Sequence, residues 1–93
     1  MPPTVDPPRI LTQLPPELTW SEGNRQELNC DADGKPKPGV TWHKDGSVIK
    51  SGHRRAKLEF TSVSYKDEGS YTCVAKNIGG MKEKQVKVNV LCK

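Results

Sequence analysis

The residues best suited to chemistry are three cysteines, Cys30, Cys73 and Cys92, and two histidines, His43 and His53. A thiol can form a disulfide, bind a metal or attack a substrate, and the last two uses need partner residues at particular spacings. The sequence has no Cys-x-x-Cys pair, and the histidines show no ligand spacing. We therefore expect no metal site, and the cysteine count fits one bonded pair and one leftover thiol.

Catalytic motifs are missing from the sequence. It contains no Gly-rich phosphate loop, no Gly-x-Ser-x-Gly elbow, and no serine or cysteine nucleophile with an identifiable base. We predict a non-catalytic protein that needs no cofactor.

The charge balance is moderately basic, with 15 Lys and Arg, 11 Asp and Glu, and a net charge of +4. The simpler interpretation is a solvated surface with an excess of lysine, and the alternative is a patch for heparan sulfate or another polyanion. The candidate patch residues are Lys35, Lys37, His53, Arg54, Arg55 and Lys57. No nucleic-acid partner is expected. Because no stretch approaches the ~18 apolar residues of a membrane span, we expect no direct membrane insertion either.

The elements that position these residues read as short strands. Apolar and polar residues alternate in short runs, separated by Gly, Pro, Asn and Asp clusters, and no segment sustains a 3.6-residue period. This pattern predicts an all-β antiparallel sandwich of seven or eight strands over residues 10–91. Residues 1–9 read as a proline-rich linker, and residues 92–93 as a C-terminal boundary.

Alternation also predicts which side chains point inward. Val40 and Trp42 share one face of a strand that ends at Asp45-Gly46, a dipeptide that favours a two-residue hairpin turn. The predicted core residues are Leu28, Trp42, Leu58, Phe60, Tyr71 and Val88.

One combination of residues resembles a known family. Cys30 is followed twelve residues later by Trp42, and then by the run Asp67-Glu68-Gly69-Ser70-Tyr71-Thr72-Cys73. From Leu18 to Val90 the sequence resembles the immunoglobulin superfamily, in its intermediate and C2-type sets. The resemblance implies a Cys30–Cys73 disulfide between facing sheets, with Trp42 packed against it and a Tyr71 hydroxyl bonded to the backbone. It also implies an ion pair between Asp67 and Arg54 or Arg55.

A closer likeness involves Leu18–Gly23, Lys44–Gly46 and Val86–Leu91, which together look like a membrane-proximal domain of the intercellular adhesion molecules. Such molecules bind integrins through an exposed carboxylate, for which Asp45 and Glu59 are the candidates here. Neither residue lies in a distinctive motif, so a spacer role is the preferred expectation.

These resemblances imply an extracellular module of a cell-surface adhesion or receptor protein. Its partners would be neighbouring immunoglobulin domains or a cell-surface protein, and Cys92 would be free or bonded to a neighbouring domain or chain. No Asn-x-Ser/Thr sequon is present, which weakens this assignment without reversing it. The rival hypotheses are an intracellular cytoskeletal or muscle scaffold domain with reduced cysteines, and a polyanion-binding module.

Overall fold

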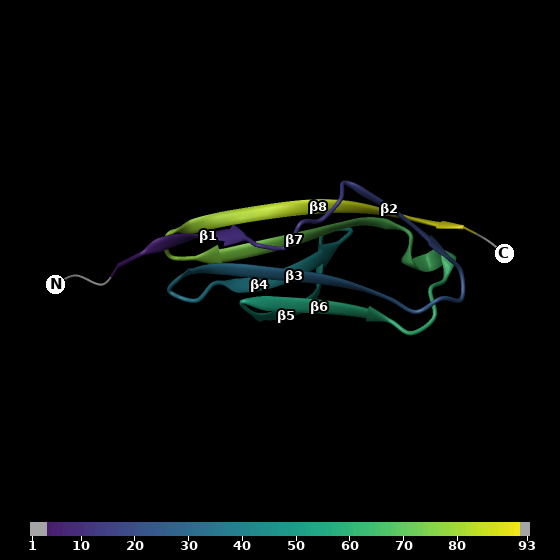
Figure 1. Cartoon of the computed structure of the whole chain (residues 1–93), viewed down its shortest axis with the longest axis horizontal. Helices are drawn as coiled ribbons and strands as arrows, with labels where there is room; N and C mark the ends of the chain where they lie inside the picture. The colour runs from purple at the N-terminus through teal and green to yellow at the C-terminus, as the bar shows by residue number, and fades with distance from the viewer. Residues whose placement is uncertain (1–3, 92–93) are drawn as a thin grey trace.

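The computed structural model describes residues 4–91, which form eight strands and one turn of 3-10 helix (Figure 1). In chain order the elements are β1 (Asp6–Ile10), β2 (Glu17–Ser21), β3 (Gln26–Lys35), β4 (Gly39–Lys44), β5 (Ser47–His53), β6 (Arg55–Phe60), η1 (Tyr65–Asp67), β7 (Gly69–Asn77) and β8 (Gly80–Leu91).

The strands form two facing layers that run along the long axis of the molecule (Figure 1). One sheet has the order β1-β3-β6, and the other has the order β2-β8-β7-β4-β5. Strand β2 pairs in parallel with β8, and all other pairs are antiparallel. The expected immunoglobulin-like sandwich is confirmed, and a disulfide between Cys30 on β3 and Cys73 on β7 joins its two sheets.

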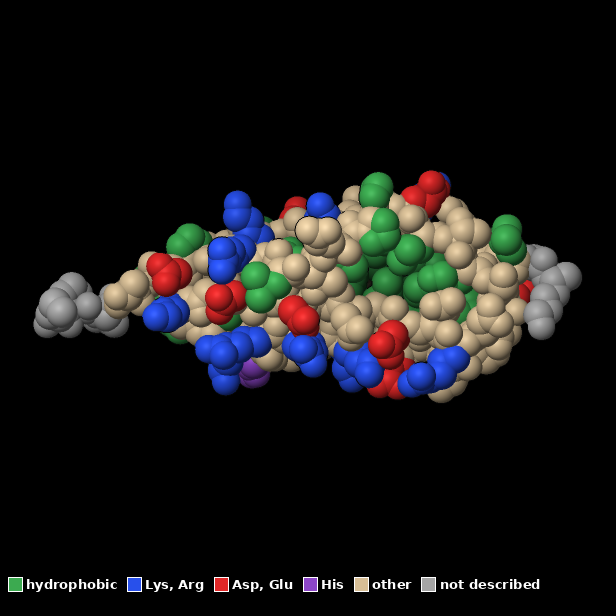
Figure 2. Space-filling model, in the orientation of Figure 1, with side chains coloured by type: hydrophobic (Ala, Val, Ile, Leu, Met, Phe, Trp, Pro, Cys, Tyr) green, Lys and Arg blue, Asp and Glu red, His purple; other side chains and the backbone are tan. Residues whose placement is uncertain are grey.

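The core lies between the two sheets and follows the two-residue alternation of the strands. Leu28, Trp42, Tyr71 and Val88 are buried, as expected. Leu58 and Phe60 are only half-buried and pack against the core from its side. On the face of the molecule that Figure 2 shows, hydrophobic side chains reach the surface in the half nearer the C-terminus.

The structured region begins earlier than the sequence predicts. Asp6–Ile10 forms β1, which pairs with the end of β3, and Pro8 is fully buried. The expectation of a linker through residue 9 is therefore wrong for residues 6–9. A proline is compatible with an edge strand because its missing N–H can face away from the ladder, and β1 lies at the edge of its sheet.

Two tight turns connect β4, β5 and β6. Asp45 and Gly46 both have positive φ, 54° and 81°, as the two-residue hairpin predicted from the Asp-Gly dipeptide requires. Arg54 alone separates β5 from β6, and its φ is 64°. The chain therefore crosses from one sheet to the other within one residue. Strand β6 lies at the edge of its sheet.

Candidate interaction surface

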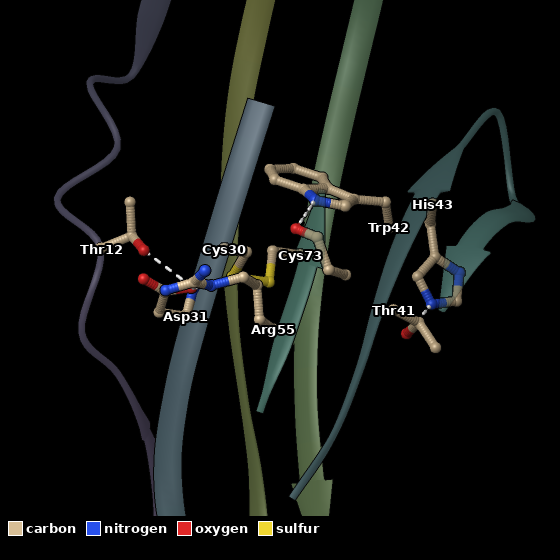
Figure 3. Close-up of a disulfide and its surroundings, with 9 residues drawn as sticks. Thr12, Cys30, Asp31, Thr41, Trp42, His43, Arg55 and Cys73 are labelled. Atoms are coloured by element: carbon tan, nitrogen blue, oxygen red, sulfur yellow. Dashed lines mark hydrogen bonds and ion pairs between the residues drawn. A yellow bond between two sulfur atoms is a disulfide. The ribbon is translucent and has the colours of Figure 1, made fainter. Parts of the chain in front are cut away.

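The cysteine pair lies at the centre of the core. Cys30 and Cys73 form a disulfide between β3 and β7, and neither side chain is exposed. The ring of Trp42 lies beside the bridge, and its Nε1 donates to the Ala56 carbonyl at 3.0 Å (Figure 3). These two thiols are thus structural, and any binding must use the surface of the sandwich.

The 3-10 helix and the start of β7 form a second structural cluster. Tyr71 donates its hydroxyl hydrogen to the Asp67 carbonyl, the bond that the family resemblance implies. The Asp67 carboxylate accepts from the backbone N–H of Ser64 at 2.8 Å, completing a capping box. Burial, reinforced by the carboxylates of Asp67 and Asp45, raises the pKa of Tyr71 to about 12.

The expected ion pair between Asp67 and an arginine does not form among residues 4–91. Arg55 lies opposite Asp31 in the β3–β6 register, and its Nε is 2.6 Å from the Asp31 carboxylate (Figure 3). Asp67 lies beyond the other end of β6, where it caps the 3-10 helix. The prediction was wrong because the short β5–β6 turn places both arginines at the opposite end of that strand.

The residues of the predicted basic patch fall into two groups, one with acidic neighbours and one without. Lys57 contacts Glu27 at 3.3 Å and Glu59 at 3.7 Å, and its ammonium group lowers the pKa of Glu27. Arg55 is paired with Asp31. Lys35 is exposed and makes no ion pair among the described residues, but the acidic residue Asp6 lies opposite it in the β1–β3 register. Within the part of the chain that the structure describes, Lys37, His53 and Arg54 are exposed and make no ion pair.

Lys76 lies beside these three residues, although sequence reasoning did not select it. Gly39 pairs with His53 on one side and with Lys76 on the other, and the Arg54 N–H donates to the Pro38 carbonyl at 3.0 Å. Lys76 is also exposed and unpaired among the described residues. We call Lys37, His53, Arg54 and Lys76 the basic corner. Figure 2 shows Lys and Arg side chains gathered beside a His in the half nearer the N-terminus.

The charges of the two halves of the sandwich differ in sign. The registers of Cys30, Trp42 and Cys73 mark the midpoint, where Lys50 and Lys84 lie. Toward the N-terminal end the described chain has seven Lys and Arg against four Asp and Glu, and toward the C-terminal end five against seven. The first group comprises Arg9, Lys35, Lys37, Arg54, Arg55, Lys76 and Lys82, with Asp6, Asp31, Asp33 and Glu83.

The outer face of the five-stranded sheet is shallowly hollowed. Its lining side chains point away from the disulfide, and they include His43, which shares a 2.8 Å hydrogen bond with Thr41 (Figure 3). The other lining residues are Gly39, Val48, Val74, Lys76 and Met81. Mixed apolar and polar groups of this kind are typical of protein interaction surfaces.

The integrin candidates occupy ordinary positions. Asp45 is exposed in the β4–β5 turn, where its backbone conformation accounts for its presence. Glu59 contacts both Arg25, at 3.5 Å, and Lys57. The turn explains Asp45 and the ion pairs explain Glu59, so neither position indicates an integrin contact.

Metal-binding clusters and membrane spans are not found in residues 4–91. No group of three or more His, Cys, Asp or Glu side chains in this range could hold a metal ion. No helix in the same range is long and apolar enough to cross a membrane. Cys92, which was expected to be either free or bonded to a neighbouring domain or chain, lies outside the described residues.

Asn77, the last residue of β7, is a connecting residue that the sequence analysis did not identify. Its Nδ2 donates to the carbonyls of Asp6, at 2.8 Å, and Pro36, at 2.9 Å, and its Oδ1 accepts from the Gly79 N–H. One side chain thus joins β1, the β3–β4 loop and the β7–β8 turn.

Comparisons with known proteins agree with this geometry. The immunoglobulin I-set domain model matches residues 8–90. Human immunoglobulin superfamily member 10 is 38% identical over 95 residues, covering 91% of this chain and 4% of that protein. The mouse leucine-rich repeat, immunoglobulin-like domain and transmembrane domain-containing protein 3 is 38% identical over 85 residues, covering 81% of this chain and 12% of that protein.

The fold is also similar to solved structures. A chain of the titin M10–obscurin-like 1 immunoglobulin complex superposes with a TM-score of 0.80 at 29% identity, covering 95% of this chain and 97% of that one. By contrast, the chain spans only a small part of the two curated relatives, 4% and 12% of their lengths.

Proposed function

The chain belongs to the immunoglobulin I-set family, and from this premise we propose that it is a spacer and protein-interaction module of a larger extracellular or cell-surface protein. The buried Cys30–Cys73 disulfide carries this proposal. Disulfides persist in oxidising compartments and are rare in the cytosol of most cells. Because the bridge joins the two sheets at the centre of the core, its formation and the stability of the domain are coupled.

Two further observations support a spacer role at the cell surface. One relative is named as a transmembrane domain-containing protein. The two terminal segments that resemble a membrane-proximal domain of adhesion molecules, Leu18–Gly23 and Val86–Leu91, are neighbours through the parallel β2–β8 pair. In this proposal the domain stands near the membrane and orients a more distant binding domain.

The ends of the sandwich and its hollowed face would provide the protein contacts. Ile78 is 81% exposed in the β7–β8 turn, and Leu91 is 56% exposed at the opposite end. Apolar groups at both ends suit contacts with neighbouring domains in one chain, which are small and partly polar.

A second candidate, an intracellular scaffold domain, is favoured by the similarity to the titin complex chain. It requires that Cys30 and Cys73 remain reduced in the cell.

Surface labelling of the full-length protein on cells separates these candidates. An amine-reactive reagent that cannot cross membranes should modify exposed lysines such as Lys82 on intact cells, while a cytosolic marker stays unlabelled. Labelling of this domain only after permeabilisation would overturn the extracellular proposal and favour the scaffold.

A further inference from the structure

The basic corner combines three elements in one exposed place. His53 on β5, Gly39 on β4 and Lys76 on β7 are register partners across adjacent strands. Neighbouring strands are about 4.8 Å apart, so the backbones of His53 and Lys76 lie about 10 Å from each other. Lys37 lies two residues before Gly39, and Arg54 directly follows His53. Three cations, Lys37, Arg54 and Lys76, thus come from separate segments to one end of the sheet.

The backbone of Arg54 gives a second, independent indication. A φ of 64° is uncommon for a residue with a side chain and is adopted more easily by Gly or Asn. Hydrogen bonds fix this conformation on both sides, because the Arg54 N–H donates to Pro38 and its carbonyl accepts from Ala32 at 2.7 Å. A position that would suit Gly instead carries an exposed arginine without an ion pair among residues 4–91. Strained positions of this kind tend to occur at functional sites.

We propose that the basic corner binds a linear sulfated polysaccharide. An extended chain of sulfate groups matches cations spread over several segments better than a single small anion does. The choice of ligand rests on the proposed extracellular placement, where such polymers are available.

Two other polyanions fit the surroundings less well. Single-stranded nucleic acid is bound by stacking on exposed aromatic rings, but the one exposed aromatic residue in the described chain, Tyr65, lies on the 3-10 helix in the opposite half. An anionic membrane would need an apolar anchor beside the cations. Two exposed apolar side chains, Ile78 and Met81, lie near the β7–β8 turn. Scattered exposed apolar side chains are common on protein surfaces and do not by themselves indicate a membrane anchor.

The test is binding of the purified chain to a heparin-derived octasaccharide, measured by calorimetry at several salt concentrations. For three dominant cations we expect the logarithm of the dissociation constant to rise with the logarithm of salt concentration with a slope of about 2 to 3. Arg54→Gly should weaken binding by about fivefold to tenfold at low salt, because one charge-assisted contact is lost. Its melting temperature should stay unchanged or rise, because Gly adopts a φ of 64° without strain. Arg54→Asn is a second variant suited to that φ.

A matched pair of triple variants tests the location of the site. Lys37→Ser, Arg54→Gly and Lys76→Ser together should weaken binding by more than about 100-fold. Arg25→Ser, Lys66→Ser and Lys87→Ser remove the same charge from the other half and should change affinity by less than about threefold. Equal losses in both variants, or wild-type binding by the first, would overturn the proposal.

Vesicles containing phosphatidylserine provide the membrane comparison. Tighter binding to these vesicles than to the octasaccharide, lost in Ile78→Ser, would replace the polysaccharide with a membrane surface. All these measurements use the purified chain, so their failure is distinguishable from a failure of the cell-surface assignment, which is measured on cells.

Discussion

At the scale of single residues, the side chains that carry the family resemblance are structural. Tyr71 combines a buried ring with a hydroxyl that donates to Asp67, and its ring is 6.0 Å from that of Phe60. The Lys44 ammonium lies 5.2 Å from the Tyr71 ring and donates to the Lys66 carbonyl. Tyr71 therefore fixes the 3-10 helix against the sandwich.

The raised pKa of Tyr71 predicts a loss of stability in alkaline solution. In the folded chain this pKa is about 12, and in the unfolded chain it returns to about 10. Folding favours the neutral phenol. The stabilisation that this group gives the folded state is full well below pH 10, and it is lost as the pH rises from 10 toward 12. We expect the free energy of unfolding to fall by about 1.5 kcal/mol between pH 10 and about pH 11.5 from this group.

Urea denaturation at increasing pH measures this effect, with Tyr71→Phe as the control. The variant should be less stable at pH 7 by about 1 kcal/mol because it lacks the hydroxyl hydrogen bond. Its decline above pH 10 should be smaller than that of the original chain. Parallel declines in the two proteins would show that Tyr71 titrates normally.

At the scale of elements, β1 depends on contacts that are distant in sequence. It pairs with the end of β3, and Asn77 at the end of β7 donates to the carbonyl of its first residue, Asp6. A side chain built on Gly34 would place its Cβ 3.0 Å from the Asn77 amide nitrogen, so Gly at this position allows the close approach. The Asn77 side chain thus holds β1 at the N-terminal end of the sandwich, and Gly34 leaves the space for it.

Replacing Asn77 should loosen that end. Asn77→Ala removes the donors to the Asp6 and Pro36 carbonyls, and we expect a loss of about 1–3 kcal/mol in unfolding free energy. Amide hydrogen exchange should accelerate in β1 more than in β7. As a control, Asn29→Ala removes only a 3.4 Å contact with Glu27 and should cost less than about 0.5 kcal/mol. Unchanged exchange in β1 would contradict the connecting role of Asn77.

At the scale of the whole molecule, a small sandwich is held together by one covalent link. In the chain-entropy model, a disulfide that joins residues 43 positions apart contributes about 4 kcal/mol. Typical domains are stable by only about 5–15 kcal/mol. The bridge is therefore a large part of the stability, and the redox state of the compartment decides whether it forms.

Much of this molecule is predictable from local patterns, because strand faces and the Asp-Gly turn depend on neighbouring residues. Alternation predicted the burial of Leu28, Trp42 and Val88. The partners of Arg55 and Lys57 were not predictable in the same way, because they depend on the register between β3 and β6. The same limit applies to Lys76, which reaches the basic corner only through the pairing of β7 with β4.

The most direct test of an extracellular module is the state of Cys30 and Cys73 in protein isolated from its native source. Free thiols would be blocked at lysis, and the peptides then mapped by mass spectrometry. We predict that the two cysteines are recovered joined to each other in a single linked peptide pair. Recovery of both as blocked free thiols would contradict the account and identify an intracellular domain.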